Sequence, residues 1–296
     1  MAFGSTTRKY YHEFSSVEGT TYWWEIRERA FDNTNPSTPP TELVANTTGH
    51  CVTRWVSDGD DEFSPVMGSE TTITFFDDSG DSVLTDLFAG DVDFHKDYAL
   101  AITSSSGSVL HWIGYMEPVD INVSEGAKTI VLRAADGLGR LADYPYVSND
   151  ATGAPKEGRD RVTTIISEML EKIEFGSGFY TACSYYPRKA SSQLTSDNDP
   201  LYNIYADRKA FSIPDNGGSK GATPVSRLDA LRAILMRFSL RIFHDGGKWH
   251  LYQPSLLYSA TSFSRFEYDS AGSAVGGAEP LNKSTLSHSY TPTTEV

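Results

Sequence analysis

Acidic side chains are the first candidates for chemistry, because the chain has 39 Asp and Glu residues against 25 Lys and Arg. The run from Asp58 to Glu62 (DGDDE) gathers carboxylates, which are the ligands that Ca²⁺ prefers. It lacks the full spacing of a calcium-binding loop. The pair Asp77 and Asp78, followed by Gly80, has the composition of a type I turn. We therefore interpret both segments as solvated acidic turns and predict no metal site.

Three histidine positions have neighbours that could assist a general base: His12 beside Glu13, His244 beside Asp245, and His50. Seven His residues in a chain of this length arise without any catalytic demand, so we interpret them as ordinary strand or surface residues. The chain contains no HExxH, GxSxG or GxxxxGK[ST] motif, and no GxGxxG followed by a suitable strand and helix.

Sugar chemistry would use other side chains. A glycoside hydrolase needs two carboxylates on opposite sides of a cleft, and the many acidic residues here single out no pair. Trp23, Trp24, Tyr185 and Tyr186 could stack on sugar rings. Neighbouring strand residues face opposite sides, so only one of the two Trp residues could line a site, and core packing explains the pair better. We assign no catalytic residue and no cofactor.

Length and charge narrow the function classes. A chain of 296 residues favours two domains. The formal charge of −14 argues against wrapping nucleic acid, but it suits a surface that DNA must pass without binding.

Cys51 and Cys183 are predicted to be free thiols. No apolar leader or membrane-length run is present, so synthesis and folding in the cytoplasm are expected.

The first part of the chain is predicted to form strands that position these residues. It is rich in aromatic residues, and apolar and polar residues alternate over short runs. We predict a hairpin over 8–31 with its break at Glu18-Gly19, a Pro-rich loop over 33–42, strands over 50–56 and 71–76, a hairpin of 98–103 with 109–115, and a strand over 128–134.

The apolar period then changes to that of a helix. A stripe from Val162 to Ile173 predicts an amphipathic helix, with Asp160 as its N-cap. Ser226 and Asp229 resemble a capping box that begins a second helix, whose buried face we predict to comprise Leu228, Leu231, Ile234, Leu235 and Phe238. A hairpin over 240–252 follows, with a turn at Asp245-Gly246-Gly247.

These elements predict an α+β fold that is mainly β. The predicted organisation is an N-terminal antiparallel, barrel-like β domain over 1–145, a smaller α+β domain with two amphipathic helices over 146–258, and a flexible Gly-, Ser- and Thr-rich extension over 259–296.

Two segments carry a resemblance to a known family. In the first, the strand element Trp112-Ile113-Gly114-Tyr115 precedes a strand that ends in Asp136-Gly137-Leu138. In the second, a Leu-rich helix leads into a strand, a DG turn and a strand bearing Trp249. Both resemble the baseplate hub and tail-tip proteins of tailed bacteriophages, over about half the chain.

The residues themselves support structural roles. Gly137 permits a tight turn, and Gly114 permits close backbone approach or a bulge. The candidate structural or interface residues are Trp112, Gly114, Tyr115, Asp136, Gly137, Leu138 and Trp249.

The resemblance implies a structural protein of the virion tail rather than an enzyme. It implies a homotrimeric ring at the distal end of the tail tube, with tail-tube, distal-tail and spike or fibre proteins as partners. DNA would pass through the ring without specific binding. A carbohydrate-binding tail adhesin is the second hypothesis, and a cell-wall hydrolase is the third.

Overall fold

The structure is a computed structural model that describes residues 6–16, 19–29, 40–45, 51–57, 64–77, 83, 87, 97–104, 109–117, 120–124, 127–147, 156–175, 178–183, 199–213, 223–259 and 262–282. The acidic run at 58–62, His50, and the pair Tyr185 and Tyr186 lie outside these residues.

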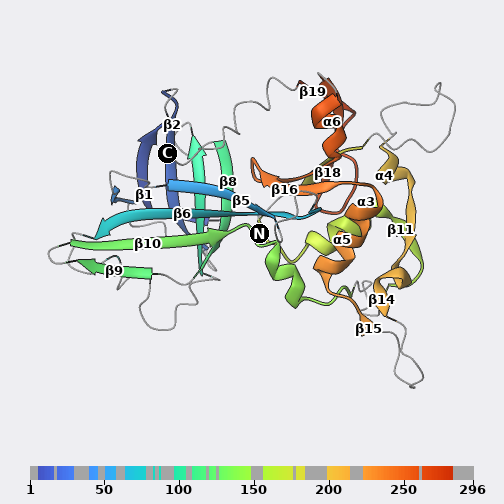
Figure 1. The fold of residues 1–296 in the computed structure, drawn as a ribbon, viewed down its shortest axis with the longest axis horizontal. Coiled ribbons are helices and arrows are strands. Elements are labelled where there is room, and N and C mark those ends of the chain that lie inside the picture. Colours follow the sequence, from blue (N-terminus) through green and yellow to red (C-terminus); the bar gives the residue numbers. More distant parts are fainter. Residues whose placement is uncertain are drawn as a thin grey trace.

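The N-terminal half forms a ten-stranded sheet (Figure 1). Its strands are β1 Thr6–Ser15, β2 Thr21–Arg29, β3 Thr41–Glu42, β4 Val44–Ala45, β5 Cys51–Ser57, β6 Met67–Asp77, β7 Tyr98–Ser104, β8 Val109–Met116, β9 Asp120–Ser124 and β10 Ala127–Ala135. The order runs β3-β1-β2-β7-β8-β10-β6-β4, with β5 paired to β6 and β9 to β10. The predicted hairpins are confirmed as β1–β2 and β7–β8. The mainly β prediction is confirmed, but no ladder among the described residues closes the sheet into a barrel.

The C-terminal half is an α+β unit. Its strands are β11 Arg159–Arg161, β12 Gly178–Ala182, β13 Tyr205–Asp207, β14 Ser212–Ile213, β15 Thr223–Pro224, β16 Arg241–Asp245, β17 Lys248–Tyr252, β18 Ser262–Asp269 and β19 Glu279–Asn282. Its helices are η2 Gly139–Asp143, α3 Val162–Leu170, α4 Pro200–Asn203, η4 Arg208–Phe211, α5 Arg227–Arg237 and α6 Pro254–Ser259. A five-stranded sheet runs β16-β17-β12-β18-β19, and β16–β17 is the predicted hairpin.

The two predicted helices begin differently. The second is capped as expected, because the Ser226 hydroxyl accepts the Asp229 N–H at 3.0 Å and donates to the Asp229 carboxylate at 2.7 Å. The N-cap predicted for the first helix is wrong: Arg161 holds that position, and its side chain makes no capping hydrogen bond. The reason is that Asp160 belongs to β11, where Arg208 takes its carboxylate at 2.9 Å.

The predicted flexible extension from residue 259 differs from the structure at residues 262–282. There β18 pairs with β12, and β19 pairs with β18. Phe263 and Tyr268 supply buried side chains to this part of the sheet. Some of the Gly and Ser residues on which the linker prediction was based form the turn after β18. There the Gly272 N–H donates to Asp269 O at 3.0 Å.

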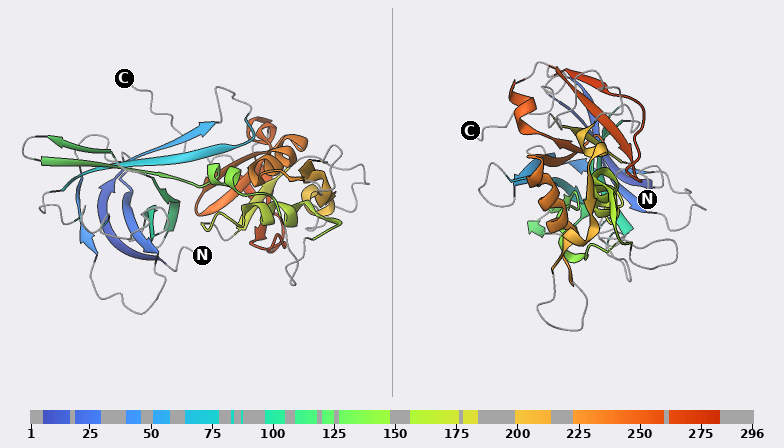
Figure 2. Two further views of the ribbon diagram at one scale, coloured as in Figure 1. Left: turned by 90° about the horizontal axis from the view of Figure 1, so that it is seen from below. Right: turned by 90° about the vertical axis from the view of Figure 1, so that its right-hand side faces the viewer.

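Strands β7 and β8 are buried on both faces. On one face, Leu100 and Trp112 belong to the core of the ten-stranded sheet. On the other face, Ala101, Ile113 and Tyr115 belong to a core shared with the α+β unit. The first sheet therefore packs directly on the second unit through its two central strands, and Figure 2 shows β6, in cyan, running from the first half toward the second.

Candidate functional site

Six of the seven residues singled out from the sequence lie together where the two halves meet. They are Trp112, Gly114 and Tyr115 on β8, and Asp136, Gly137 and Leu138 directly after β10. The terminal residues of β8 and β10 are neighbours, because Ala135 pairs with Tyr115. This set is called the junction cluster below.

A buried carboxylate forms the polar centre of the junction cluster. Asp136 Oδ2 accepts hydrogen bonds from the Ser69 N–H at 2.6 Å and from the Ser69 hydroxyl at 2.9 Å, and Oδ1 accepts the Leu138 N–H at 3.0 Å. The indole Nε1–H of Trp112 in turn donates to the Ser69 hydroxyl at 2.8 Å. One chain of hydrogen bonds therefore joins β6, β8 and the turn after β10.

Burial raises the pKa of Asp136 to about 6, although the donors from Leu138 and Ser69 oppose the shift. The folded-state pKa thus lies above the ordinary value of 3.8, so folding takes up a proton between these two values. The stability that this carboxyl group contributes is greatest at low pH and falls as the pH rises through that window.

We expect Asp136→Asn to reduce the free energy of unfolding by about 1–3 kcal/mol at neutral pH, because an amide offers one acceptor and turns an N–H toward a donor. The deficit should grow as the pH is lowered from 6 toward 4, since only the wild type gains stability there. Urea unfolding of both proteins across this range measures it. Asp143→Asn, at an exposed position, is the control, and equal stability of the Asp136 variant and the wild type would contradict the assignment.

Each glycine of the junction cluster is covered by an aromatic ring. A Cβ on Gly114 would lie 2.3 Å from the Trp112 ring and 2.6 Å from the Ala135 carbonyl oxygen. Gly137 has a φ of +94°, and a Cβ there would lie 2.6 Å from the Tyr115 ring. Gly137 therefore serves the turn, and Gly114 serves a close backbone approach.

Tyr115 links the junction cluster to the α+β unit. Its hydroxyl accepts the backbone N–H of Glu174 at 2.9 Å, and its ring centroid lies 4.3 Å from that of Phe175. The guanidinium carbon of Arg140 lies 4.1 Å from the same centroid. Tyr115 is buried, so within this chain it packs between the two halves.

Trp249, the seventh residue, lies on β17 and belongs to the same hydrophobic core as Tyr115 and Leu138. It is buried, with its ring 4.9 Å from that of His244. The β16–β17 hairpin also contacts the first sheet, because the Gly246 N–H donates to His111 O at 2.9 Å and the Ile242 N–H donates to Pro65 O at 2.8 Å.

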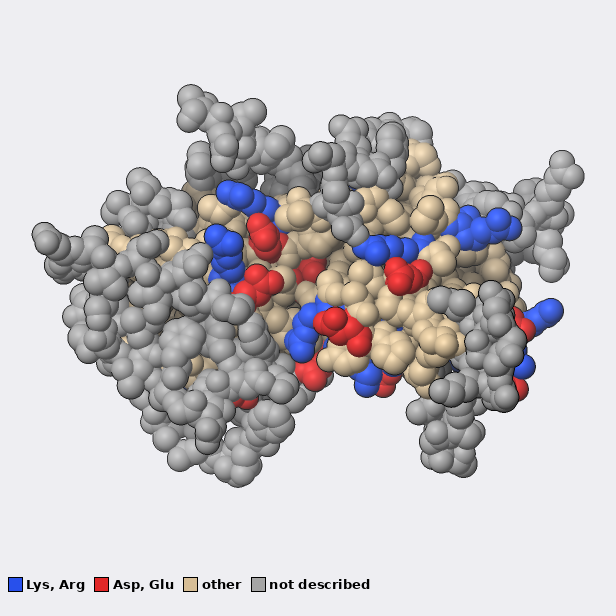
Figure 3. All heavy atoms as spheres, turned by 60° about the horizontal axis from the view of Figure 1, so that its bottom comes forward, with Lys and Arg blue, Asp and Glu red and all other residues tan. Residues whose placement is uncertain are grey.

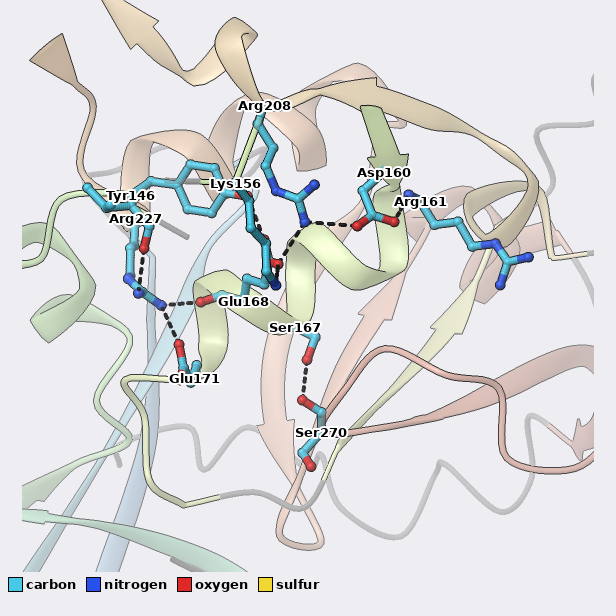
Figure 4. A network of polar contacts seen from close by, with 11 residues as sticks. Tyr146, Lys156, Asp160, Arg161, Ser167, Glu168, Glu171, Arg208, Arg227 and Ser270 are labelled. Carbon is cyan, nitrogen blue, oxygen red and sulfur yellow. Dashed lines mark hydrogen bonds and ion pairs between the residues drawn. The ribbon is translucent and has the colours of Figure 1, made fainter. Parts of the chain in front are cut away.

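A second polar network holds the α+β unit together around Glu168 on α3 (Figure 4). The Glu168 carboxylate accepts from the Tyr146 hydroxyl at 2.8 Å, from Lys156 at 2.9 Å and from Arg208 at 2.7 Å. Arg227 of α5 donates to the backbone carbonyl of Glu168. The network joins α3 to the segments on either side of it and to α5.

The buried carboxylates are engaged by donors of this chain. Glu25 accepts from Arg27 at 2.6 Å and from Thr103 at 2.9 Å, and Asp199 accepts from the Tyr268 hydroxyl at 2.7 Å and from Leu201 N–H. Burial raises the pKa of Asp199. Carboxylates saturated in this way act as anchors between elements rather than as exposed bases.

The other sequence candidates form no catalytic grouping among the described residues. His12 hydrogen-bonds to Leu43 O at 2.9 Å, and of the Trp pair only Trp23 is partly exposed. His244 is fully buried, and burial lowers its pKa to about 3. Within the described ranges, no group of three or more His, Cys, Asp or Glu side chains could hold a metal ion. None of the helices described is long and apolar enough to cross a membrane.

Sequence reasoning missed the partners that complete these networks: Ser69, Glu168, Arg208, Arg227 and Asp199. A single Ser, or an Arg among 25 basic residues, carries no local signal that it will be buried. The interaction that defines each residue comes from a part of the chain far away in sequence.

No family model matches the chain, and no curated protein matches it. Among solved structures, it is similar to the tail protein from Neisseria meningitidis MC58, with 11% identity and a TM-score of 0.34 over 68% of this chain and 45% of that one. The 43 kDa tail protein of prophage MuSo2 from Shewanella oneidensis has 11% identity and a TM-score of 0.32, covering 68% and 49%. Prophage tail protein gp18 from Listeria monocytogenes EGD-e has 7% identity and a TM-score of 0.33, covering 80% and 61%. The chain spans about half the length of the first two proteins, and all three are tail proteins by name.

Proposed function

We propose that this chain is a structural protein of a bacteriophage tail, located at the baseplate hub or tail tip. There it forms a homotrimeric ring that joins the tail tube to the distal-tail, spike or fibre proteins. The tail location follows the sequence resemblance carried by Trp112 to Tyr115 and by Asp136 to Leu138. These are the segments that the fold brings together in the junction cluster.

The observation that carries the proposal is the double burial of β7 and β8. Because both faces of this strand pair are packed, the first sheet and the α+β unit share one core. Close-packed interiors are stiff and transmit strain. A part that joins a tube to a distal apparatus needs this rigid connection between the surfaces that it presents to each.

The charge of −14 fits a ring through which DNA passes, because carboxylates repel phosphates. On the face in Figure 3, several of the visible Lys and Arg side chains lie beside Asp and Glu, so the described residues of this face form no continuous acidic surface.

Native mass spectrometry tests the assembly. We expect the purified chain to give a mass of three copies at micromolar concentration, and we expect electron microscopy to show rings. The trimer should persist at high salt if its contacts are mainly apolar.

A chain that stays monomeric at every concentration would contradict the ring. A monomer that binds defined sugars on a glycan array would favour the adhesin instead. Clearing of a cell-wall zymogram, abolished by one carboxylate substitution, would favour the hydrolase.

A further inference from the structure

Strand β5 lies at an edge of the ten-stranded sheet. Among the described residues it pairs with β6 alone, and every residue of β5 has a partner there. In the left view of Figure 2, β5, in light blue, runs along the outer side of β6, in cyan. An edge strand presents a row of backbone N–H and C=O groups that can pair with a further strand. The edge of β5 is therefore a candidate site for binding an extended segment.

The sequence of β5, CVTRWVS, does not protect this edge. Natural sheet edges are commonly blocked by Pro, by Lys or by a β-bulge. β5 contains neither Pro nor Lys, and its ladder with β6 runs without a register shift. The β-branched residues Val52, Thr53 and Val56 favour an extended conformation. The strand is therefore compatible with the addition of another strand at its side.

The exposed face of β5 is apolar at two positions and cationic between them. Side chains alternate along a strand, so Val52, Arg54 and Val56 share the exposed face, whereas Cys51 packs against the core of the sheet. Val52 is 38% exposed and Val56 is 49% exposed. The solvent-facing positions of an antiparallel sheet are commonly polar. A strand placed beside β5 would cover both Val side chains with its own.

Arg54 determines the charge that a neighbouring strand should carry. Its cross-strand neighbour on β6 is Glu70, but among the described residues no ion pair joins Arg54 to a carboxylate. Opposite charges on directly opposed strand residues stabilise the pair, and like charges destabilise it. A second copy of β5 that covered both Val residues in antiparallel register would place Arg54 opposite Arg54. The edge therefore favours a different strand over self-pairing.

We propose that β5 binds an extended segment of a partner protein by strand addition, and that this segment carries Asp or Glu between two apolar residues at alternate positions. The acidic residue would lie opposite Arg54, and the apolar residues would cover Val52 and Val56. Main-chain hydrogen bonds along the edge would provide the rest of the affinity. The inference rests on β5 and does not require the tail assignment.

Fluorescence anisotropy of labelled peptides, titrated with the purified chain, tests the proposal. We expect the peptide TVTETVT to bind saturably, with a dissociation constant between the micromolar and millimolar ranges. The peptide TVTKTVT should bind at least about fivefold more weakly, because its Lys would lie opposite Arg54. A TVTETVT peptide with every amide nitrogen methylated should not bind, since it has no N–H groups to donate to the edge.

Arg54→Glu should reverse the preference, so that TVTKTVT binds at least about fivefold more tightly than TVTETVT. Arg159→Glu, at an exposed position on β11, is the matched control and should keep the preference of the wild type. Circular dichroism confirms that both variants fold. Arg54→Gln, which should bind the two peptides about equally, replaces Arg54→Glu if that variant does not fold.

Three outcomes would overturn the proposal: no binding of TVTETVT, equal binding of the Glu and Lys peptides by the wild type, or undiminished binding of the methylated peptide. None of them bears on the mass of the assembly in native mass spectrometry. Failure of strand addition and failure of the homotrimeric ring are therefore distinguishable.

Discussion

Gly114→Ala should lower the free energy of unfolding by at least about 3 kcal/mol, which is at the upper end for overpacking by one methyl group. The new Cβ would lie 2.3 Å from the Trp112 ring and 2.6 Å from the Ala135 carbonyl oxygen. The ring cannot move away freely, because its Nε1–H is bonded to Ser69 at 2.8 Å. The carbonyl belongs to β10, which pairs with β8. Urea unfolding followed by circular dichroism measures the loss.

Gly68→Ala is the matched control, because Gly68 is also a strand glycine of the same sheet. A Cβ there would lie 3.8 Å from its nearest neighbour, the Val56 carbonyl oxygen, which is an ordinary contact. We expect its stability to stay within about 1 kcal/mol of the wild type. If the two variants were equally stable, the close approach at Gly114 would not be a constraint on the fold.

A double variant separates the two contacts of Gly114. In a Trp112→Leu background the ring is absent, so Gly114→Ala should cost less than it does in the wild type. The cost should not vanish, because the Ala135 carbonyl remains 2.6 Å away. If the losses of stability in the two single variants simply added up in the double variant, the Trp112 ring would have to move aside for the methyl group at low cost.

The part of the sequence whose structure was predicted best is packed on both of its faces. The runs 98–103 and 112–116 are nearly continuous in apolar residues, because β7 and β8 contact one core on each face. Their strand character, their hairpin and the turn at Gly137 were therefore predictable from local pattern. The cap at Ser226 was predictable for the same reason, since its partner is three residues away.

The remaining features depend on contacts between distant segments. Asp160 has the residue type of an N-cap, but β13 extends the strand around it and Arg208 takes its carboxylate. The Gly-rich end of the chain was predicted to be a linker, because its strand β18 pairs with β12, which is far away in sequence. Ser69 lies 67 positions from Asp136, so no pattern could indicate that the two residues share a hydrogen bond.

The buried histidines of the β16–β17 hairpin respond to pH in the opposite direction to Asp136. Burial lowers the pKa of His244 to about 3, and that of His250 to about 4. Unfolding therefore takes up protons below the ordinary value of 6.5. The stability that these groups contribute is full above that pH and is lost as the pH falls. The stability contributed by Asp136 changes with pH in the opposite direction, so the two effects partly cancel in the wild type. The contribution of each residue is therefore measured as the difference in stability between its variant and the wild type.

His244→Leu should raise the free energy of unfolding by about 1–3 kcal/mol at neutral pH, because neither ring nitrogen of this buried side chain has a hydrogen-bond partner among the residues that the structure describes. The advantage over the wild type should grow by about 1.4 kcal/mol for each pH unit below 6.5, since the variant has no group to protonate there. Urea unfolding between neutral pH and about pH 5 measures both effects.

Two further substitutions separate polarity from titration. His244→Gln keeps a polar side chain without a titratable ring, so it should show the same pH trend with no gain at neutral pH. His250→Leu should lose stability at neutral pH, because the His250 ring bonds to the Tyr252 hydroxyl at 2.9 Å and to Asp245 O at 3.1 Å. Below pH 6.5 it should recover relative to the wild type, as the protonation of His250 no longer opposes folding. If His244→Leu were the less stable protein at neutral pH, the ring of His244 would have to contribute a contact that outweighs its two unbonded nitrogens.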